Sequence, residues 1–336
     1  GKSGSVANAT LMNNLTVATG STLVADSNTL TVSGDFTTSG GLIGKSCYDF
    51  DGDSGKITVV DGNNQFSTGG TWEAWINADS DGEASNARLF DKNDNVRFYL
   101  SSEVGGISKL EFKHAFSGTE GRWHTTDTCI TNGKWHHVAV TYNGSDVAND
   151  PIIYVDGKQI ALTESQAPVG TITGTTGGGT IIGNRNEQDV TFDGRIAMVR
   201  VFGDVRTESE LRADMFNPFA SMANTGDLRY MFEFNEGTGT TIDNVETTEG
   251  YDGTITAGGS AWAGSGDFTV GTSTLVLTGS SKNLTYKGNE TLKNLTISGS
   301  YTMNDAAGDG WLGPSGTINI SGTLASAGSE ALLLDD

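Results

Sequence analysis

The sequence lacks several features that mark large classes of protein. No apolar run approaches the roughly 20 residues that an α-helix needs to cross a bilayer. Basic residues are scarce, with 20 Lys and Arg against 41 Asp and Glu, which gives a net charge of −21. Nucleic acids and anionic lipids both attract basic surfaces. The sequence therefore predicts no nucleic-acid partner and no membrane insertion.

Proline and cysteine are also rare, with 4 and 2 residues in a chain of 336. Cys47 and Cys129 allow either one disulfide or two thiols, and they are too few for a metal cluster. Glycine is abundant, with 47 residues and no collagen period. Aromatic and β-branched residues are too frequent for a disordered chain. This composition is typical of soluble β proteins that are extracellular or lie on a cell surface or virion surface.

Apolar and polar residues alternate along most of the chain, which is the pattern of half-buried β-strands. Clear examples are 57–60, 138–142, 152–155 and 198–202. Asp156-Gly157 and Asp193-Gly194 separate such runs with residues that tolerate the positive φ of tight turns. Only 207–216 resembles a helix, which Pro218 ends. The sequence therefore predicts an all-β fold with one short helix.

The two ends of the chain, 1–45 and 263–336, are polar and repetitive, and they resemble each other. NLTVATGS at 14–21 parallels NLTISGS at 294–300, and 30–36 parallels 318–324. Short strands with Gly, Ser and Asn corners are typical of β-solenoid rungs, which bury their inward row only against neighbouring rungs. Small β-sandwich or hairpin modules are the alternative. Rungs at the two ends can stack on each other, on the central domain or on a neighbouring chain.

Five segments of the middle part occur in the same order in a known family. They are YDFDG at 48–52, TWEAWI at 71–76, GKWHHVAVTY at 133–142, IYVDGK at 153–158 and FDGRIAMVRVF at 192–202. With these segments, 46–218 resembles the laminin-G-like domain of the concanavalin-A-like lectin/glucanase superfamily. The resemblance implies an antiparallel jelly-roll sandwich of two sheets. The flanking repeats resemble those of phage tail-associated and bacterial surface proteins.

A further stretch, LRYMFEFNEGTGTTID at 228–243, resembles the strand that leads into such a domain, yet here it follows the domain. It either completes the sandwich from the other end, as in a permuted chain, or is the remnant of a second copy. The predicted organisation is a β-repeat segment at 1–45, a jelly roll at 46–218, a lead-in-like segment at 219–262 and a second β-repeat segment at 263–336.

Catalytic motifs are incomplete. Retaining glucanases place Glu-x-Asp-x-x-Glu on one strand so that alternate carboxylates face one cleft. This chain has Glu187 and Asp189, but Phe192 stands where the third carboxylate would be. His136 and His137 are adjacent on a strand and point to opposite faces, one towards the core and one towards the surface, so they do not form a metal pair. The sequence therefore predicts no enzyme, and a divergent glycan-active enzyme is the lesser alternative.

Two pairs of residues are candidates for binding. Trp123 and His124 lie in the polar stretch 117–126, where an exposed aromatic ring would stack on a sugar and a loop anchor is the alternative. Asp51 and Asp193 each precede a glycine at positions that match the family. Carboxylates suit Ca²⁺, and the resemblance implies that calcium is common in such domains, with Asp51 and Asp193 as ligands. A solvated acidic rim is the alternative.

These observations favour a virion- or cell-surface structural and adhesion protein that displays a lectin-like domain to glycans or surface polysaccharide. The alternative is an architectural subunit. Open rungs leave strand edges that invite another strand, and similar rungs at both ends allow head-to-tail self-association into an extracellular filament or fibre, or assembly with other structural proteins.

Overall fold

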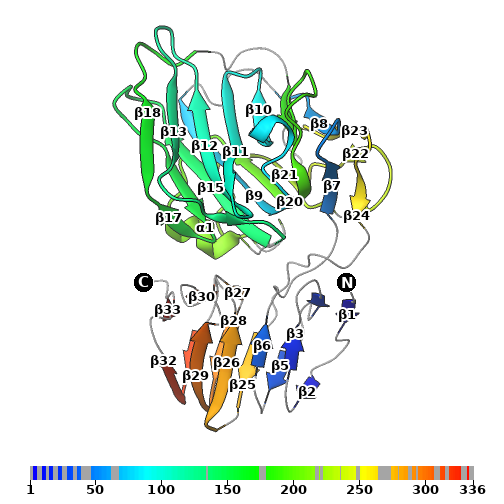
Figure 1. Ribbon diagram of the computed structural model, residues 1–336, viewed down its shortest axis with the longest axis vertical. Coiled ribbons are helices and arrows are strands. Elements are labelled where there is room, and N and C mark those ends of the chain that lie inside the picture. Colours follow the sequence, from blue (N-terminus) through cyan, green and yellow to red (C-terminus); the bar gives the residue numbers. More distant parts are fainter. Residues whose placement is uncertain are drawn as a thin grey trace. The chain divides into compact units, whose positions relative to one another are not determined.

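The computed structural model consists mainly of short β-strands (Figure 1). It describes 47–263 except 62–67, 134, 174–178, 216–218, 220–221, 235 and 247–249. In 274–332 it describes all but 279, 287–289, 293, 306–310, 315–317 and 327–330, and before 47 it describes six strands. The chain divides into two compact units, one of 46–208 with 225–264 and one of 1–45 with 209–224 and 265–336.

Helical structure is confined to two short pieces of the described chain. They are the 3-10 turn η1 (Glu83–Ser85) and the α-helix α1 (Glu208–Asp214). The α-helix confirms the prediction over 207–216. Among the described residues, neither piece has the length and apolar character needed to cross a membrane.

The unit of 46–208 and 225–264 contains two antiparallel sheets. The larger has ten strands, in the order β18 (Leu162–Gln166), β13 (Gly121–Thr125), β12 (Ile107–His114), β11 (Val96–Val104), β10 (Arg88–Lys92), β19 (Thr180–Ile182), β8 (Lys56–Val59), β23 (Gly253–Thr256) and β22 (Thr241–Ile242), with β14 (Ile130–Thr131) beside β12. The smaller has eight, in the order β17 (Lys158–Ile160), β16 (Ile152–Val155), β15 (Trp135–Asn143), β9 (Gly69–Ala78), β20 (Asp193–Phe202), β7 (Cys47–Asp51) and β24 (Ala261–Ala263), with β21 (Leu228–Phe232) beside β20. The predicted jelly-roll sandwich is confirmed.

The lead-in-like segment contributes strands to both sheets. Strand β23 pairs with β8 through Ile255 and Ile57, and β24 pairs with β7 through Trp262 and Tyr48. The Trp262 ring also meets the Tyr48 ring edge-on, with centroids 5.5 Å apart. Of the two sequence interpretations, the structure therefore shows the one in which this segment completes the sandwich from the other end.

The core of the sandwich is built from alternate residues of the facing strands. Trp72 on β9 is 1% exposed and packs against Phe90 and Phe98 of the other sheet. In the eight-stranded sheet, the central strands β9, β15 and β20 are buried on the outer face as well. There the Arg206 backbone N–H donates to the Thr71 hydroxyl, which in turn donates to the Asp204 carbonyl. In the ten-stranded sheet, by contrast, buried and accessible residues alternate along β13, and no residue of β18 is fully buried.

Cys47 and Cys129 both carry thiols and are not joined by a disulfide. Cys47 is buried on β7 and Cys129 lies between β13 and β14. Burial raises the pKa of Cys129 to about 11, so its thiol stays protonated at neutral pH.

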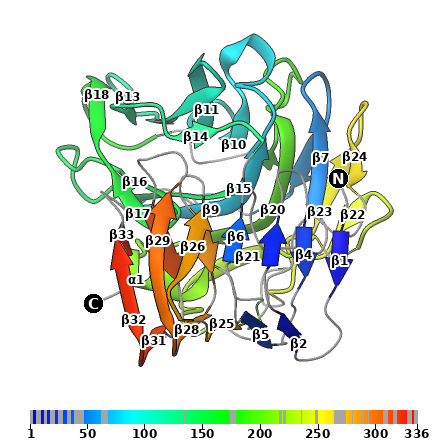
Figure 2. The same ribbon diagram turned by 60° about the horizontal axis from the view of Figure 1, so that its bottom comes forward.

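The other unit contains stacked parallel strands (Figure 2). One five-stranded sheet consists of β2 (Thr10–Met12), β5 (Thr29–Val32), β25 (Thr274–Leu277), β28 (Asn294–Ile297) and β31 (Ile318–Ile320). The second consists of β3 (Leu15–Val17), β6 (Phe36–Thr38), β26 (Lys282–Tyr286), β29 (Ser300–Asp305) and β32 (Thr323–Ser326). Smaller sheets are formed by β27 (Glu290–Leu292), β30 (Trp311–Pro314) and β33 (Ala331–Leu332), and by β1 (Ser3–Ser5) with β4 (Thr22–Val24).

Each of these sheets takes one strand from each turn of the chain, which is the arrangement of a β-solenoid. Leu277 and Ile297 are register partners on β25 and β28, and both are fully buried. The sequence repeats therefore correspond to rungs and not to separate hairpin modules. Because β5 pairs directly with β25, and β6 with β26, the jelly roll is inserted in the chain between two neighbouring rungs.

Candidate functional site

Trp123 lies on strand β13 and not in a polar loop, which corrects the expectation of an exposed aromatic ring. The side chain is 1% exposed and packs against the rings of Phe112 and Tyr142 in the core. Its Nε1–H donates to the Asp150 carboxylate at 2.8 Å. The physical reason is the alternation of a strand, in which neighbours point to opposite faces. Trp123 therefore cannot stack on a bound sugar.

His124, the neighbour of Trp123, points to the other face and is partly exposed. Its backbone lies opposite Glu111 on β12 and Thr163 on β18. Tyr99 on β11 lies opposite Glu111, and Arg88 on β10 lies opposite Tyr99. Register partners point to the same face of an antiparallel sheet. The five side chains thus form one row across five strands on the outer face of the ten-stranded sheet.

Hydrogen bonds fix the centre of this row. The Tyr99 hydroxyl donates to Glu111 Oε2 at 2.6 Å, and the Ser101 hydroxyl donates to Glu111 Oε1. Burial is the main cause that raises the pKa of Tyr99, and the nearby Glu111 carboxylate raises it further. The hydroxyl therefore remains a donor at neutral pH. The guanidinium groups of Arg88 and Arg97 lie over the Tyr99 ring, with their central carbons 4.7 and 5.6 Å from its centroid. The aromatic ring and the carboxylate are therefore held in one position.

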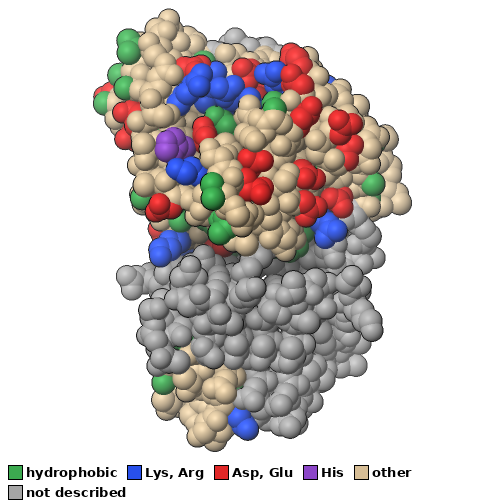
Figure 3. Space-filling model, viewed as in Figure 1, with side chains coloured by type: hydrophobic (Ala, Val, Ile, Leu, Met, Phe, Trp, Pro, Cys, Tyr) green, Lys and Arg blue, Asp and Glu red, His purple; other side chains and the backbone are tan. Residues whose placement is uncertain are grey.

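A second row beside the first consists of Asp91, Arg97, Lys113 and Arg122 on β10 to β13. Its cations contact carboxylates of adjoining turns. Arg97 pairs with Asp94 at 2.7 Å, and both Lys113 and Arg122 contact Glu120. Figure 3 shows Lys and Arg side chains interspersed with Asp and Glu over the upper part of this face, next to a histidine. The face is thus densely charged but largely neutralised within itself.

Comparison with known proteins identifies the fold that carries this face. Residues 51–212 match the family described as the concanavalin A-like lectin/glucanases superfamily. This part of the chain is a concanavalin A-like domain. No curated protein matches the sequence.

Two solved structures illustrate the similarity. A "putative carbohydrate binding protein" from Bacteroides ovatus is 23% identical over 68% of this chain, with a TM-score of 0.50. The match spans 62% of the length of that protein. A heptameric SAP-like pentraxin from Limulus polyphemus is 14% identical over 63% of this chain and 95% of its own, with a TM-score of 0.43. The first similarity supports the assignment of the concanavalin A-like fold.

Asp51 and Asp193, the predicted calcium ligands, are register partners on β7 and β20. The Asp51 carboxylate, however, accepts hydrogen bonds from the backbone N–H groups of 53, 54, 55 and 259 and from the Ser260 hydroxyl. Partial burial alone would raise the pKa of Asp51, but these donors hold it at about 2. The Asp193 carboxylate accepts separately from the Ser80 hydroxyl at 2.6 Å.

This geometry does not fit a calcium ion at Asp51, because the lone pairs that would bind the cation already face N–H and O–H hydrogens. Asp51 instead holds the turn after β7 to the turn before β24. In the described parts of the chain, no group of three or more His, Cys, Asp or Glu side chains is arranged to hold a metal.

The incomplete glucanase motif lies in a bent loop between β19 and β20, not on a strand. Asp189 is bound by two nitrogens of Arg185 at 2.6 and 2.7 Å, and Glu187 lies 3.6 Å from the same guanidinium. The two carboxylates therefore share one counter-ion at the surface and do not face each other across a cleft.

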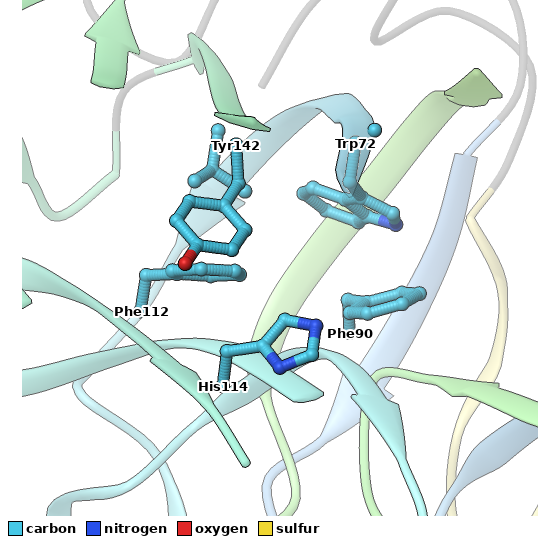
Figure 4. Close-up of a pocket in the computed structure, with 7 residues that line it drawn as sticks. Trp72, Phe90, Phe112, His114 and Tyr142 are labelled. Carbon is cyan, nitrogen blue, oxygen red and sulfur yellow. The ribbon is translucent and has the colours of Figure 1, made fainter. Parts of the chain in front are cut away.

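The concanavalin A-like domain also encloses a small cavity between its sheets. Figure 4 shows the rings of Trp72, Phe90, Phe112, His114 and Tyr142 around it. The cavity measures about 10 Å³, which is room for about one water molecule. It is too small for a sugar ring, so it is a packing defect of the core and not a ligand site.

Proposed function

We propose that the concanavalin A-like domain binds carbohydrate without catalysis, on the outer face of its ten-stranded sheet. The observation that carries this proposal is the row of Arg88, Tyr99, Glu111, His124 and Thr163 across five strands. Lectins and glucanases, which give the superfamily its name, both bind sugars. The central strands β9, β15 and β20 of the opposite sheet are buried on both faces, whereas the ten-stranded sheet has accessible residues on its outer face.

The row offers the groups that sugar hydroxyls need. Glu111 is an acceptor whose position is fixed by Tyr99 and Ser101. Thr163 is exposed and His124 is half-buried, and Arg122 of the second row is exposed beside them. Because the internal hydrogen bonds already hold the side chains near β11 and β12, a ligand would lose little affinity to ordering them.

The solenoid supports a surface role for the whole chain. In the described rungs, Thr296 and Thr302 are partly exposed between buried neighbours, and the jelly roll is inserted in the chain between two adjoining rungs. We infer an extracellular structural or adhesion protein, on a cell or virion surface, in which the solenoid carries the carbohydrate-binding domain and contacts other structural proteins.

The double variant His124→Ala/Thr163→Ala tests the proposed face. Each side chain is expected to give about one hydrogen bond, worth about 1 kcal/mol, so the dissociation constant should rise roughly 10- to 30-fold. A glycan array would select the ligand, and isothermal titration would measure its affinity. The control is Lys158→Ala, an exposed residue on β17 of the other sheet. Unchanged affinity in the double variant, or binding of no glycan by the native protein, would contradict the proposal.

A second candidate function is architectural, and one side chain favours it. Ile320 on β31 is the register partner of the buried Ile297, yet it is 40% exposed. Within the described residues, β31 has no strand on its other edge. A second copy could cover both the apolar residue and the strand edge by stacking a rung there.

The architectural candidate predicts concentration-dependent assembly. Sedimentation should show oligomers of the native protein growing with concentration, and Ile320→Lys should shift them towards monomer because it places a charge in the apolar row. A control substitution at the exposed polar Asn319 should leave assembly unchanged. A purely monomeric native protein at high concentration would exclude this candidate.

A further inference from the structure

One cation of the ten-stranded face differs from its neighbours. The Lys109 ammonium on β12 donates to the Thr126 carbonyl at 2.7 Å, a neutral group. Among the described residues it has no carboxylate within ion-pair distance, whereas Arg97, Lys113 and Arg122 each contact one. In a chain with 41 acidic residues and 20 basic ones, a half-buried lysine without a carboxylate is a positive charge that is not neutralised locally.

His124 supplies a second open group next to this charge. Its Nδ1 lies 2.9 Å from the Thr125 carbonyl. A carbonyl can only accept, so Nδ1 carries the hydrogen and Nε2 is left for another partner. No described residue contacts Nε2 within hydrogen-bond distance. His124 lies opposite Glu111, two residues from Lys109 on the same face, so the two open groups flank one carboxylate.

The Glu111 carboxylate does not bind either of these two open groups. Both of its oxygens accept hydroxyl hydrogens from β11, on the side away from His124. On the His124 side, the hydroxyls of Thr126 and Thr163 lie 3.1 Å apart, and both residues are exposed. The position is therefore bordered by an ammonium group, an imidazole nitrogen and two hydroxyls. These groups suit an anionic oxygen better than a neutral sugar hydroxyl, because a charge-assisted hydrogen bond is about twice as strong as a neutral one.

We propose that the ligand is an anionic sugar, whose carboxylate or sulfate group contacts Lys109 and His124. This inference rests on the proposed function and adds the chemical class of the glycan. The net charge of −21 repels densely charged polyanions at long range. The preferred ligand therefore has isolated anionic groups on an otherwise neutral chain.

A glycan array tests whether the ligand is an anionic sugar. Each sialylated, uronic-acid and sulfated glycan is printed beside its neutral parent. The native protein should prefer acidic members, and titration of the best pair should show at least a tenfold lower dissociation constant for the acidic sugar. The sialylated and uronic-acid spots report a carboxylate, and the sulfated spots report a sulfate. Lys109→Gln should reduce the preference to within about twofold.

Lys158→Gln is the matched control, because it removes one exposed positive charge on the other sheet. It should keep the full preference. Equal binding of acidic and neutral members by the native protein would overturn the inference and leave the proposed function standing. Equal loss of preference in Lys109→Gln and Lys158→Gln would also overturn it, because net charge alone would then explain the result. Binding of no glycan at all would overturn the proposed function together with the inference.

Discussion

Replacing Glu73 by glutamine is expected to lower the free energy of unfolding by about 3–5 kcal/mol, the usual effect of breaking a buried ion pair from one side. Glu73 lies on β9 and is 1% exposed. Its Oε1 accepts from Arg200 Nη1 of β20 at 2.7 Å, and its Oε2 lies 3.2 Å from His137 Nε2 of β15. Glutamine keeps the shape of the side chain but removes the negative charge, so the fully buried Arg200 loses this counter-charge.

The same carboxylate predicts a pH dependence. Burial alone would raise the pKa of Glu73, but Arg200 and His137 hold it at about 2, below the ordinary value of 4.5. A folded-state pKa that is depressed contributes stability above the unfolded pKa, and that contribution disappears as the pH falls through the folded value. The native protein should therefore lose stability between about pH 4.5 and pH 2. Glu73→Gln should lose less over this window.

Urea unfolding followed by tryptophan fluorescence at several pH values would measure both effects. Asp189→Asn is the matched control, because Asp189 forms a two-point ion pair with Arg185 but its side chain is 51% exposed. Exposed pairs contribute about 1 kcal/mol or less, so this variant should stay close to the native protein. An equal decrease in the free energy of unfolding of the two variants would contradict the prediction, because the burial of Glu73 would then add nothing to the effect of breaking its ion pair.

Local patterns in the sequence predicted the strands and favoured the rungs, whereas the jelly-roll sandwich was implied by the resemblance to the laminin-G-like domain. The alternation in 138–142 and 198–202 depends only on the period of a strand, and the repeats of the two ends depend only on the spacing of rungs. Both features are confirmed by β15 and β20 and by the parallel register of the solenoid. The position of the lead-in-like segment was left open, because pairing of β24 with β7 joins residues more than 200 apart in sequence.

The candidate site was harder to predict, because it depends on contacts between distant strands. Asp51 matched a family position, but the donors that occupy it include Gly259 and Ser260, far along the chain. Glu73 stands at a position where alternation predicts the outer face, yet it is 1% exposed, and its carboxylate contacts Arg200 and His137 of the neighbouring strands. One of His136 and His137 was expected at the surface, and this prediction is wrong because the structure buries both side chains.

Trp123 and His124 are adjacent in sequence and were predicted as one ligand-binding pair, so their variants give the sharpest test of the strand assignment. Trp123→Ala is expected to lower the free energy of unfolding by about 3–5 kcal/mol, the usual cost of emptying the space of a large core aromatic. It also removes the hydrogen bond to Asp150. His124→Ala should change stability by less than about 0.5 kcal/mol, because it truncates a partly exposed side chain.

Binding should show the opposite order. At a temperature where both variants remain folded, Trp123→Ala should keep the glycan affinity of the native protein, since its ring lies on the core side of β13 against Phe112 and Tyr142. His124→Ala should weaken binding about fivefold, the effect of one hydrogen bond of about 1 kcal/mol. Thermal unfolding and isothermal titration on the same samples would measure both quantities. A Trp123→Ala protein of native stability that no longer binds glycan would place the ring on the ligand side, contrary to the alternation of β13.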